Sequence, residues 1–70
     1  MMPLLYAAPG EETIIRRIGG NQEIKKHMED LGFVVGGTVT IVSEINGNLI
    51  VNVKDSRIAV SREMAEKIMV

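Results

Sequence analysis

Few side chains in this sequence of 70 residues could do chemistry. His27 is the only histidine, there is no cysteine, and Ser43, Ser56 and Ser61 lie in or beside segments with strand patterns. A first-row metal site usually needs two or more nitrogen or sulfur ligands, and an activated serine needs a base held beside it. We therefore predict no catalytic residue, no cofactor and no metal site within one chain, and no enzyme activity. A weak metal site between two copies that share His27 stays open.

The glycine pairs do not resemble a phosphate-binding loop. Gly19-Gly20 and Gly36-Gly37 lack both the GxGxxG spacing and the Walker spacing with its following lysine, so we interpret them as turns. Eight Lys and Arg against nine Asp and Glu give a net charge of -1, with one Phe and one Tyr. Nucleic-acid binding needs phosphate neutralisation and base stacking, so this composition argues against it.

The composition also indicates the cellular compartment in which the protein is expected. A chain without cysteine suits a reducing environment, and we expect a cytoplasmic protein. The apolar opening, residues 1–10, has no basic n-region and carries two prolines, so we interpret it as folded chain rather than as a signal peptide. No stretch approaches the length of a membrane span, and no linker or repeat interrupts the chain. Residues 1–70 are predicted to form a single domain.

One helix is predicted over residues 22–31. Asn21 is a favourable N-cap, and apolar side chains recur at i, i+4 and i+7 to form one narrow stripe. Gly32 is expected at the left-handed C′ position, which places Met28 and Phe33 in the apolar contact that closes a Schellman motif. Local sequence therefore specifies both ends of this helix.

Segments on both sides of this helix in the sequence have strand patterns. Residues 12–18 are rich in β-branched side chains, and their imperfect alternation indicates a bulge or a strand covered on both faces. Residues 38–53 alternate cleanly around an Asn-Gly pair. A three-residue loop, Ile45-Asn46-Gly47 with a left-handed bulge at its glycine, would pair Ile41 with Val51 and keep one face apolar. We therefore prefer this loop to a two-residue Asn-Gly turn.

The last part of the chain predicts three short elements. They are a strand over residues 57–60, a helical turn over residues 62–66 capped by Ser61, and a final strand at residues 68–70. About five strands with one inserted helix favour a mainly β fold class, a small and partly open antiparallel barrel.

One segment, residues 31–36, holds more consecutive apolar residues than alternation can bury. Some of Phe33, Val34 and Val35 should therefore be exposed. Two interpretations are equally open: these side chains plug one end of the barrel, or they form an interaction patch together with Tyr6 and the apolar N-terminal segment.

A wider pattern runs through the chain. It comprises Leu4 followed by Pro9-Gly10, Ile18-Gly19-Gly20, His27 to Phe33, Gly36, Val39, Ile41, Arg57-Ile58-Ala59-Val60, Ala65, Ile68 and Val70. With this pattern the chain resembles, over nearly its whole length, the ferrous iron transport protein A (FeoA) family of bacteria and archaea, which are small SH3-like barrels. It departs from the family where Val35 replaces a common Pro, where His27-Met28 replaces a frequent Arg-Leu pair, and where Ser61 follows Val60 in place of the usual Leu-Arg.

The resemblance implies an accessory role in ferrous iron uptake. Members of the family act in the cytoplasm beside FeoB, a membrane-embedded ferrous iron transporter with a G-protein-like GTPase domain. The chain is then expected to dock on a cytosolic part of FeoB and to modulate its assembly or GTPase-coupled transport, without carrying iron itself. The predicted partner-binding residues are Leu5, Tyr6, Met28, Phe33 and Val34. A homo-oligomer stays open.

Two other functions remain as alternatives. Similar SH3-like domains form the C-terminal module of metal-dependent transcriptional regulators, so the chain could be a relative or a fragment of such a module. Residues 35–41 also faintly resemble the KOW motif of RNA-binding and polymerase-binding barrels, although the net charge of -1 and the scarcity of aromatic side chains argue against RNA.

Overall fold

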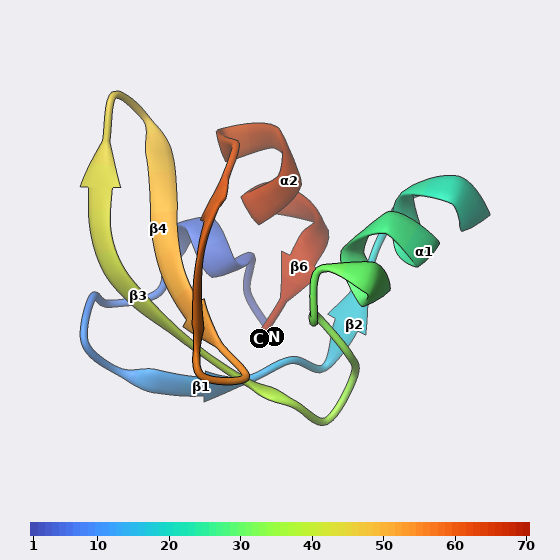
Figure 1. Cartoon of the computed structure of the whole chain (residues 1–70), viewed down its shortest axis with the longest axis horizontal. Helices are drawn as coiled ribbons and strands as arrows, with labels where there is room; N and C mark the ends of the chain where they lie inside the picture. The colour runs from blue at the N-terminus through green and yellow to red at the C-terminus, as the bar shows by residue number, and fades with distance from the viewer.

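Six strands and two α-helices follow one another in a computed structural model that describes all 70 residues. The elements are a 3-10 turn η1 (Leu4–Tyr6), β1 (Glu12–Ile14), β2 (Arg17–Ile18), α1 (Gln22–Asp30), β3 (Thr38–Ile45), β4 (Asn48–Val53), β5 (Ser56–Val60), α2 (Arg62–Lys67) and β6 (Ile68–Met69). The strands form two antiparallel sheets, β1-β3-β4-β5 and β2-β6 (Figure 1). The predicted mainly β fold with one inserted helix is confirmed, with six strands instead of about five.

The predicted N-terminal strand is broken into β1 and β2. Ile15 lies between them and is fully buried, while its neighbour Ile14 is 49% exposed. The backbone N–H of Ile15 donates to the carbonyl of Gly37 at 2.8 Å, and that of Arg16 donates to the carbonyl of Met69 at 2.8 Å. Consecutive residues thus bond to different neighbours, because the chain here leaves the four-stranded sheet for the two-stranded one. The imperfect alternation reflects this change of sheet.

A two-residue turn, Asn46-Gly47, joins β3 to β4, so the predicted three-residue loop is wrong. Both turn residues have positive φ angles, 51° and 84°, as a type I′ turn requires. This turn alone would place Ile41 opposite Asn52. A bulge between Ile41 and Ser43 shifts the register by one residue, and Ile41 therefore pairs with Val51, as predicted. The apolar face is kept by a bulge inside β3 and not by a longer loop.

The second tight turn, Lys54-Asp55, joins β4 to β5. Its residues also have positive φ angles, 48° and 63°, although neither is glycine or asparagine. Aspartate tolerates this left-handed backbone much as asparagine does, but lysine adopts it at a cost, so this turn carries local strain at Lys54 that Asn46-Gly47 avoids.

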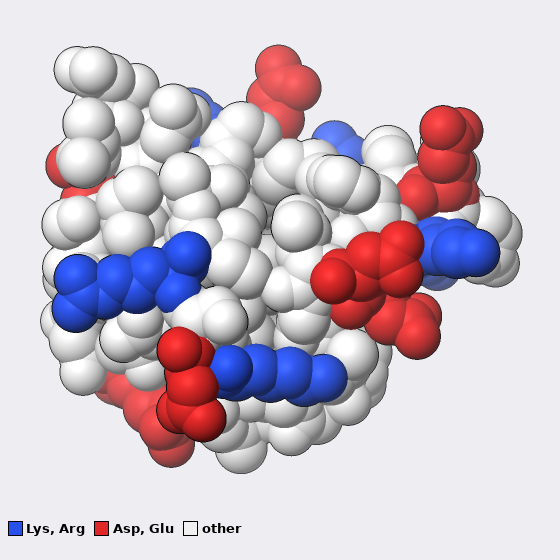
Figure 2. Space-filling view, viewed as in Figure 1, with Lys and Arg blue, Asp and Glu red and all other residues white.

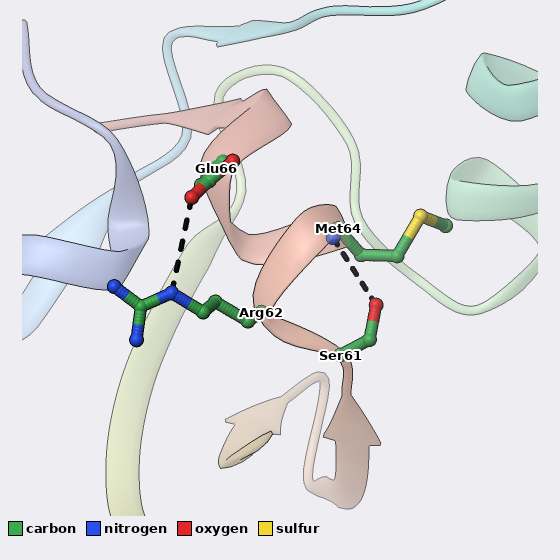
Figure 3. Close-up of polar contacts among 4 residues, drawn as sticks. All are labelled: Ser61, Arg62, Met64 and Glu66. Carbon is green, nitrogen blue, oxygen red and sulfur yellow. Dashed lines mark hydrogen bonds and ion pairs between the residues drawn. The ribbon is translucent and has the colours of Figure 1, made fainter. Parts of the chain in front are cut away.

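The short helix α2 begins at its predicted cap. The Ser61 hydroxyl oxygen accepts a hydrogen bond from the Met64 N–H at 3.2 Å (Figure 3). Arg62 and Glu66 lie one turn apart on the exposed side of the helix, where a guanidinium nitrogen approaches a carboxylate oxygen at 3.9 Å. An exposed pair at this distance adds little stability, so the cap and the buried Ala65 hold α2 in place.

The chain ends close the barrel. β6 pairs with β2, and beyond β6 the backbones of Met2 and Val70 exchange two hydrogen bonds of 2.9 and 2.8 Å. The two termini consequently lie side by side (Figure 1). Pro3 and Met69 form a further antiparallel bridge, so the N-terminal residues are part of the folded domain, as predicted.

The buried side chains form a single hydrophobic core with no buried polar or charged residue. Its 13 buried side chains are Leu4, Ala7, Ile15, Met28, Phe33, Val39, Ile41, Leu49, Val51, Val53, Val60, Ala65 and Ile68. Both α-helices and the segment that follows α1 each contribute to it. The core therefore fixes α1 and the residues after it to the barrel.

Candidate docking cleft

Helix α1 projects from the barrel (Figure 1). It begins at Asn21, whose side-chain oxygen accepts a hydrogen bond from the Ile24 N–H at 2.9 Å, which confirms the predicted N-cap. Met28 is its one fully buried side chain, while Ile24 packs against the core more loosely. Because so much of this helix is exposed, its attachment to the barrel depends on the contacts made at its C-terminal end.

The C-terminal end of α1 is a Schellman motif, as predicted. The Gly32 N–H donates to the carbonyl of Glu29, and the Phe33 N–H donates to the carbonyl of Met28, each at 2.9 Å. Gly32 has a φ angle of +106°, which suits glycine at the C′ position. The side chains of Met28 and Phe33 both lie in the core with no exposed surface. This contact anchors the helix to the barrel.

A tight turn over residues 34–37 follows the helix. The Gly37 N–H donates to the carbonyl of Val34 at 3.0 Å, and Gly36 has a φ angle of +91°. A positive φ confined to the third residue defines a type II turn, in which Val35 occupies the second position. The side chain of Val35 is 65% exposed there. The turn thus presents an aliphatic side chain to solvent.

Backbone hydrogen bonds hold this turn against the β1–β2 junction. The Gly36 N–H donates to the carbonyl of Ile15 at 2.8 Å, and the Ile15 N–H donates to the carbonyl of Gly37 at 2.8 Å. Ile15 is fully buried, so these bonds connect the turn to a fixed point of the core. The turn, β2 and α1 therefore keep a defined arrangement.

A cleft of about 500 Å³ lies between these three parts. It is lined by Arg16, Arg17, Ile18, Gln22, Lys25, Glu29, Phe33, Val34 and Val35. Three of these side chains are basic and one is acidic, which gives the cleft a formal charge of about +2 against -1 for the whole chain. Basic and acidic side chains also gather on the projecting helix (Figure 2). We call this region the docking cleft.

A second cavity, of about 390 Å³, lies on the outer face of the four-stranded sheet. Its lining contains no hydrophobic residue and consists of Glu12, Thr38, Thr40, Asn52, Lys54 and Asp55. A partner that buries apolar surface has nothing to contact there, so the docking cleft is the better candidate for a protein partner.

The predicted partner-binding residues occupy different places. Met28 and Phe33 are completely buried, so neither presents an exposed surface to a partner as predicted for a direct contact. Phe33 still lines the floor of the cleft, and partner binding by these residues stays a prediction. Val34 is half-buried and lines the cleft. Leu5 is half-buried and Tyr6 is 66% exposed, both on η1, which packs against α2. Figure 1 shows η1 and the 33–37 segment at separate places on the fold.

Sequence reasoning missed the basic side chains of the cleft. Arg16 and Arg17 are consecutive, and on an unbroken strand they would point to opposite faces. Both line the cleft because the strand breaks beside them. Two consecutive arginines next to an irregular strand were the available signal.

The metal question concerns His27. Its side chain is exposed on α1, and the chain contains no group of three or more His, Cys, Asp or Glu side chains placed to hold a metal ion.

Neither helix could span a membrane, because neither has the length and apolar character that spanning a bilayer requires.

These observations define a small antiparallel barrel with one helix inserted before its long hairpin. The FeoA domain family model matches residues 2–70, and the chain belongs to this family. A candidate Fe(2+) transport protein A of Methanocaldococcus jannaschii is 34% identical over 70 residues, which cover 100% of this chain and 85% of that protein.

Two solved structures extend the comparison. The zinc complex of FeoA from Stenotrophomonas maltophilia, described as an SH3 domain protein and a candidate ferrous iron transport activating factor, has a TM-score of 0.83 at 23% identity. The alignment covers 99% of this chain and 88% of that one. A manganese-dependent transcriptional repressor has a TM-score of 0.83 at 14% identity over 94% of this chain and 38% of the repressor. The predicted SH3-like fold is confirmed by the first match, and both show fold likeness alone.

Proposed function

We propose that this protein is a cytoplasmic accessory component of ferrous iron uptake. It docks on a cytosolic part of a FeoB-type transporter and modulates the assembly or the GTPase-coupled transport of that membrane protein. The observation that carries this proposal is the match of the FeoA domain to residues 2–70, nearly the whole chain. Its relatives carry names from Fe(2+) transport, and this chain offers no cluster of ligands for iron.

The docking cleft is the surface through which we propose this contact. It combines exposed and half-buried aliphatic side chains, Val35 and Val34, with a rim of charged groups. Protein interfaces typically have this composition, an apolar centre inside a polar rim. Docking that changes a transporter needs a surface of fixed shape, and the hydrogen bonds of Ile15 hold this one to the core.

The test is direct binding to the purified cytosolic domain of the transporter from the same organism, measured by biolayer interferometry. We expect Val35→Asp to weaken binding about tenfold or more, because it places a carboxylate in the apolar centre. The matched control is Ile45→Asp at the tip of the β3–β4 hairpin, where the side chain is similarly exposed, 55% against 65%. The control should bind like the wild type. Absence of wild-type binding at high micromolar concentration would refute the docking proposal.

A second candidate function rests on the likeness to the repressor, whose chain is covered to 38%. In that case the barrel contacts the remainder of a metal-dependent regulator. The test is a binding measurement between the chain and the DNA-binding part of such a regulator from the same organism. Binding to that part, with no binding to the transporter domain, would favour this alternative. An RNA partner is disfavoured by the net charge of -1, and we expect no salt-dependent shift with RNA.

A further inference from the structure

The basic side chains of the docking cleft form no ion pairs within the protein. Arg16, Arg17 and Lys25 line it, and all three side chains are exposed. The structure contains one ion pair, Arg62 with Glu66, so none of the three lies within 4.0 Å of a carboxylate oxygen. These cations are therefore available to an external anion.

An aliphatic surface lies beside this charge. Val35 is 65% exposed at the tip of its turn, and the half-buried Val34 lies next to it. Ile18 of β2, also half-buried, lines the same cleft. A ligand that fits both features has carboxylates for the basic side chains and an aliphatic side chain for the valines.

We infer that the docking cleft binds a short acidic peptide segment of a partner protein, with an aliphatic side chain set between its carboxylates. The inference rests on the proposed function and names the chemistry of the segment that this barrel would recognise. The carboxylates would contact Arg16 and Arg17, whose guanidinium groups bind carboxylates through paired hydrogen bonds. The aliphatic side chain would cover Val35.

Charge and composition favour a peptide over other anionic ligands. Single-stranded nucleic acid binds through aromatic stacking, yet Phe33 is completely buried and Tyr6 lies on η1, away from the cleft residues. An anionic membrane needs a broad basic face, and here Glu29 lies within the cleft. A ligand with few charges at defined positions suits a cleft of about +2.

The experiment uses the full chain and a fluorescein-labelled synthetic peptide in which leucines alternate with Glu-Asp pairs. Fluorescence anisotropy at low salt should give saturable binding that weakens as salt increases, because exposed charges are screened. The same peptide with Gln and Asn in place of Glu and Asp should bind at least about tenfold more weakly.

Matched variants test the site. Arg16→Gln with Arg17→Gln should weaken peptide binding about tenfold, and Val35→Asp should do the same. The control, Arg57→Gln with Arg62→Gln, removes the same charge at exposed positions outside the cleft and should leave binding within about twofold of the wild type. Circular dichroism of each variant verifies the fold.

Several results would overturn the inference. They are no saturable binding of the acidic peptide, equal binding of its amide analogue, an equal loss in the control variant, or displacement of the peptide by RNA or by phosphatidylglycerol vesicles. If the wild type still binds the transporter domain in those cases, only the peptide inference fails. If the peptide binds and the transporter domain does not, the proposed function fails instead.

Discussion

The backbone N–H of Phe33 donates to the carbonyl of Met28 at 2.9 Å, and both side chains are completely buried. One contact thus ends the helix and attaches it to the barrel. Met28 comes from α1, and Phe33 begins the segment that forms another wall of the docking cleft. The shape of the cleft and the stability of the domain therefore depend on the same pair of residues.

Truncating Phe33 should cost most of the stability of the domain. Phe33→Ala removes a completely buried aromatic ring, and we expect a loss of about 3–5 kcal/mol in the free energy of unfolding, measured by urea denaturation. The matched control is Tyr6→Ala, because Tyr6 is the other aromatic residue and is 66% exposed. The control should change the same quantity by less than about 1 kcal/mol. Equal losses would contradict the burial described.

Proline should be accepted at position 35. Val35 occupies the second position of a type II turn, where proline is favoured, and its N–H makes no backbone hydrogen bond. Val35→Pro should therefore leave the melting temperature unchanged or raise it, with a gain of about 0.4–1 kcal/mol. Gly37→Pro is the contrasting variant, since it removes the N–H that closes the turn. A stable Gly37→Pro and an unfolded Val35→Pro would refute the turn geometry.

The strained turn Lys54-Asp55 should be improvable. Replacing it by Asn-Gly, as Lys54→Asn with Asp55→Gly, places favoured residues at φ angles of 48° and 63°. We expect a gain of about 1 kcal/mol in the free energy of unfolding. The reciprocal change in the other hairpin, Asn46→Lys with Gly47→Asp, should lose a similar amount. A change of the same sign in both turns would contradict this interpretation.

A single chain should not bind zinc or ferrous iron tightly. His27 is exposed, and no trio of ligand side chains surrounds it. Isothermal titration of micromolar protein with Zn²⁺ or Fe²⁺ should therefore give no saturable heat, and His27→Ala should give the same trace. Saturable heat that disappears in His27→Ala, together with dimer formation in ultracentrifugation, would establish the shared intersubunit site instead.

Features set by neighbouring residues were predictable from the sequence. The N-cap at Asn21 and the Schellman motif at Gly32 depend on a few consecutive residues, and both are confirmed. The type of the β3–β4 turn was not predictable from apolar pairing. A bulge between Ile41 and Ser43 restores that pairing equally well. One extra residue shifts the register of the two strands by the same amount whether it lies inside β3 or in the loop.

Features set by distant residues were harder to predict. The strand break at Ile15 results from bonds to Gly36 and Gly37, which are far away in the sequence. That break brings Arg16 and Arg17 to one cleft. The consecutive arginines were a local signal, but the cleft that they line depends on residues distant in the sequence.

The apolar run at residues 31–36 predicted that some of Phe33, Val34 and Val35 would be exposed, and Val35 is, at 65%. Which of the three side chains the fold would bury could not be predicted from the run itself, because Phe33 is covered by the core.

Contact between the docking cleft and a cytosolic part of the FeoB-type transporter is what we propose above all. The most direct measurement is a titration of the ¹⁵N-labelled protein with that cytosolic domain, followed by amide chemical shifts. We expect the largest changes at the cleft-lining residues Arg16, Arg17, Lys25, Val34 and Val35. Changes confined to the polar cavity around Asn52, or no changes at saturating partner concentration, would contradict the proposed contact.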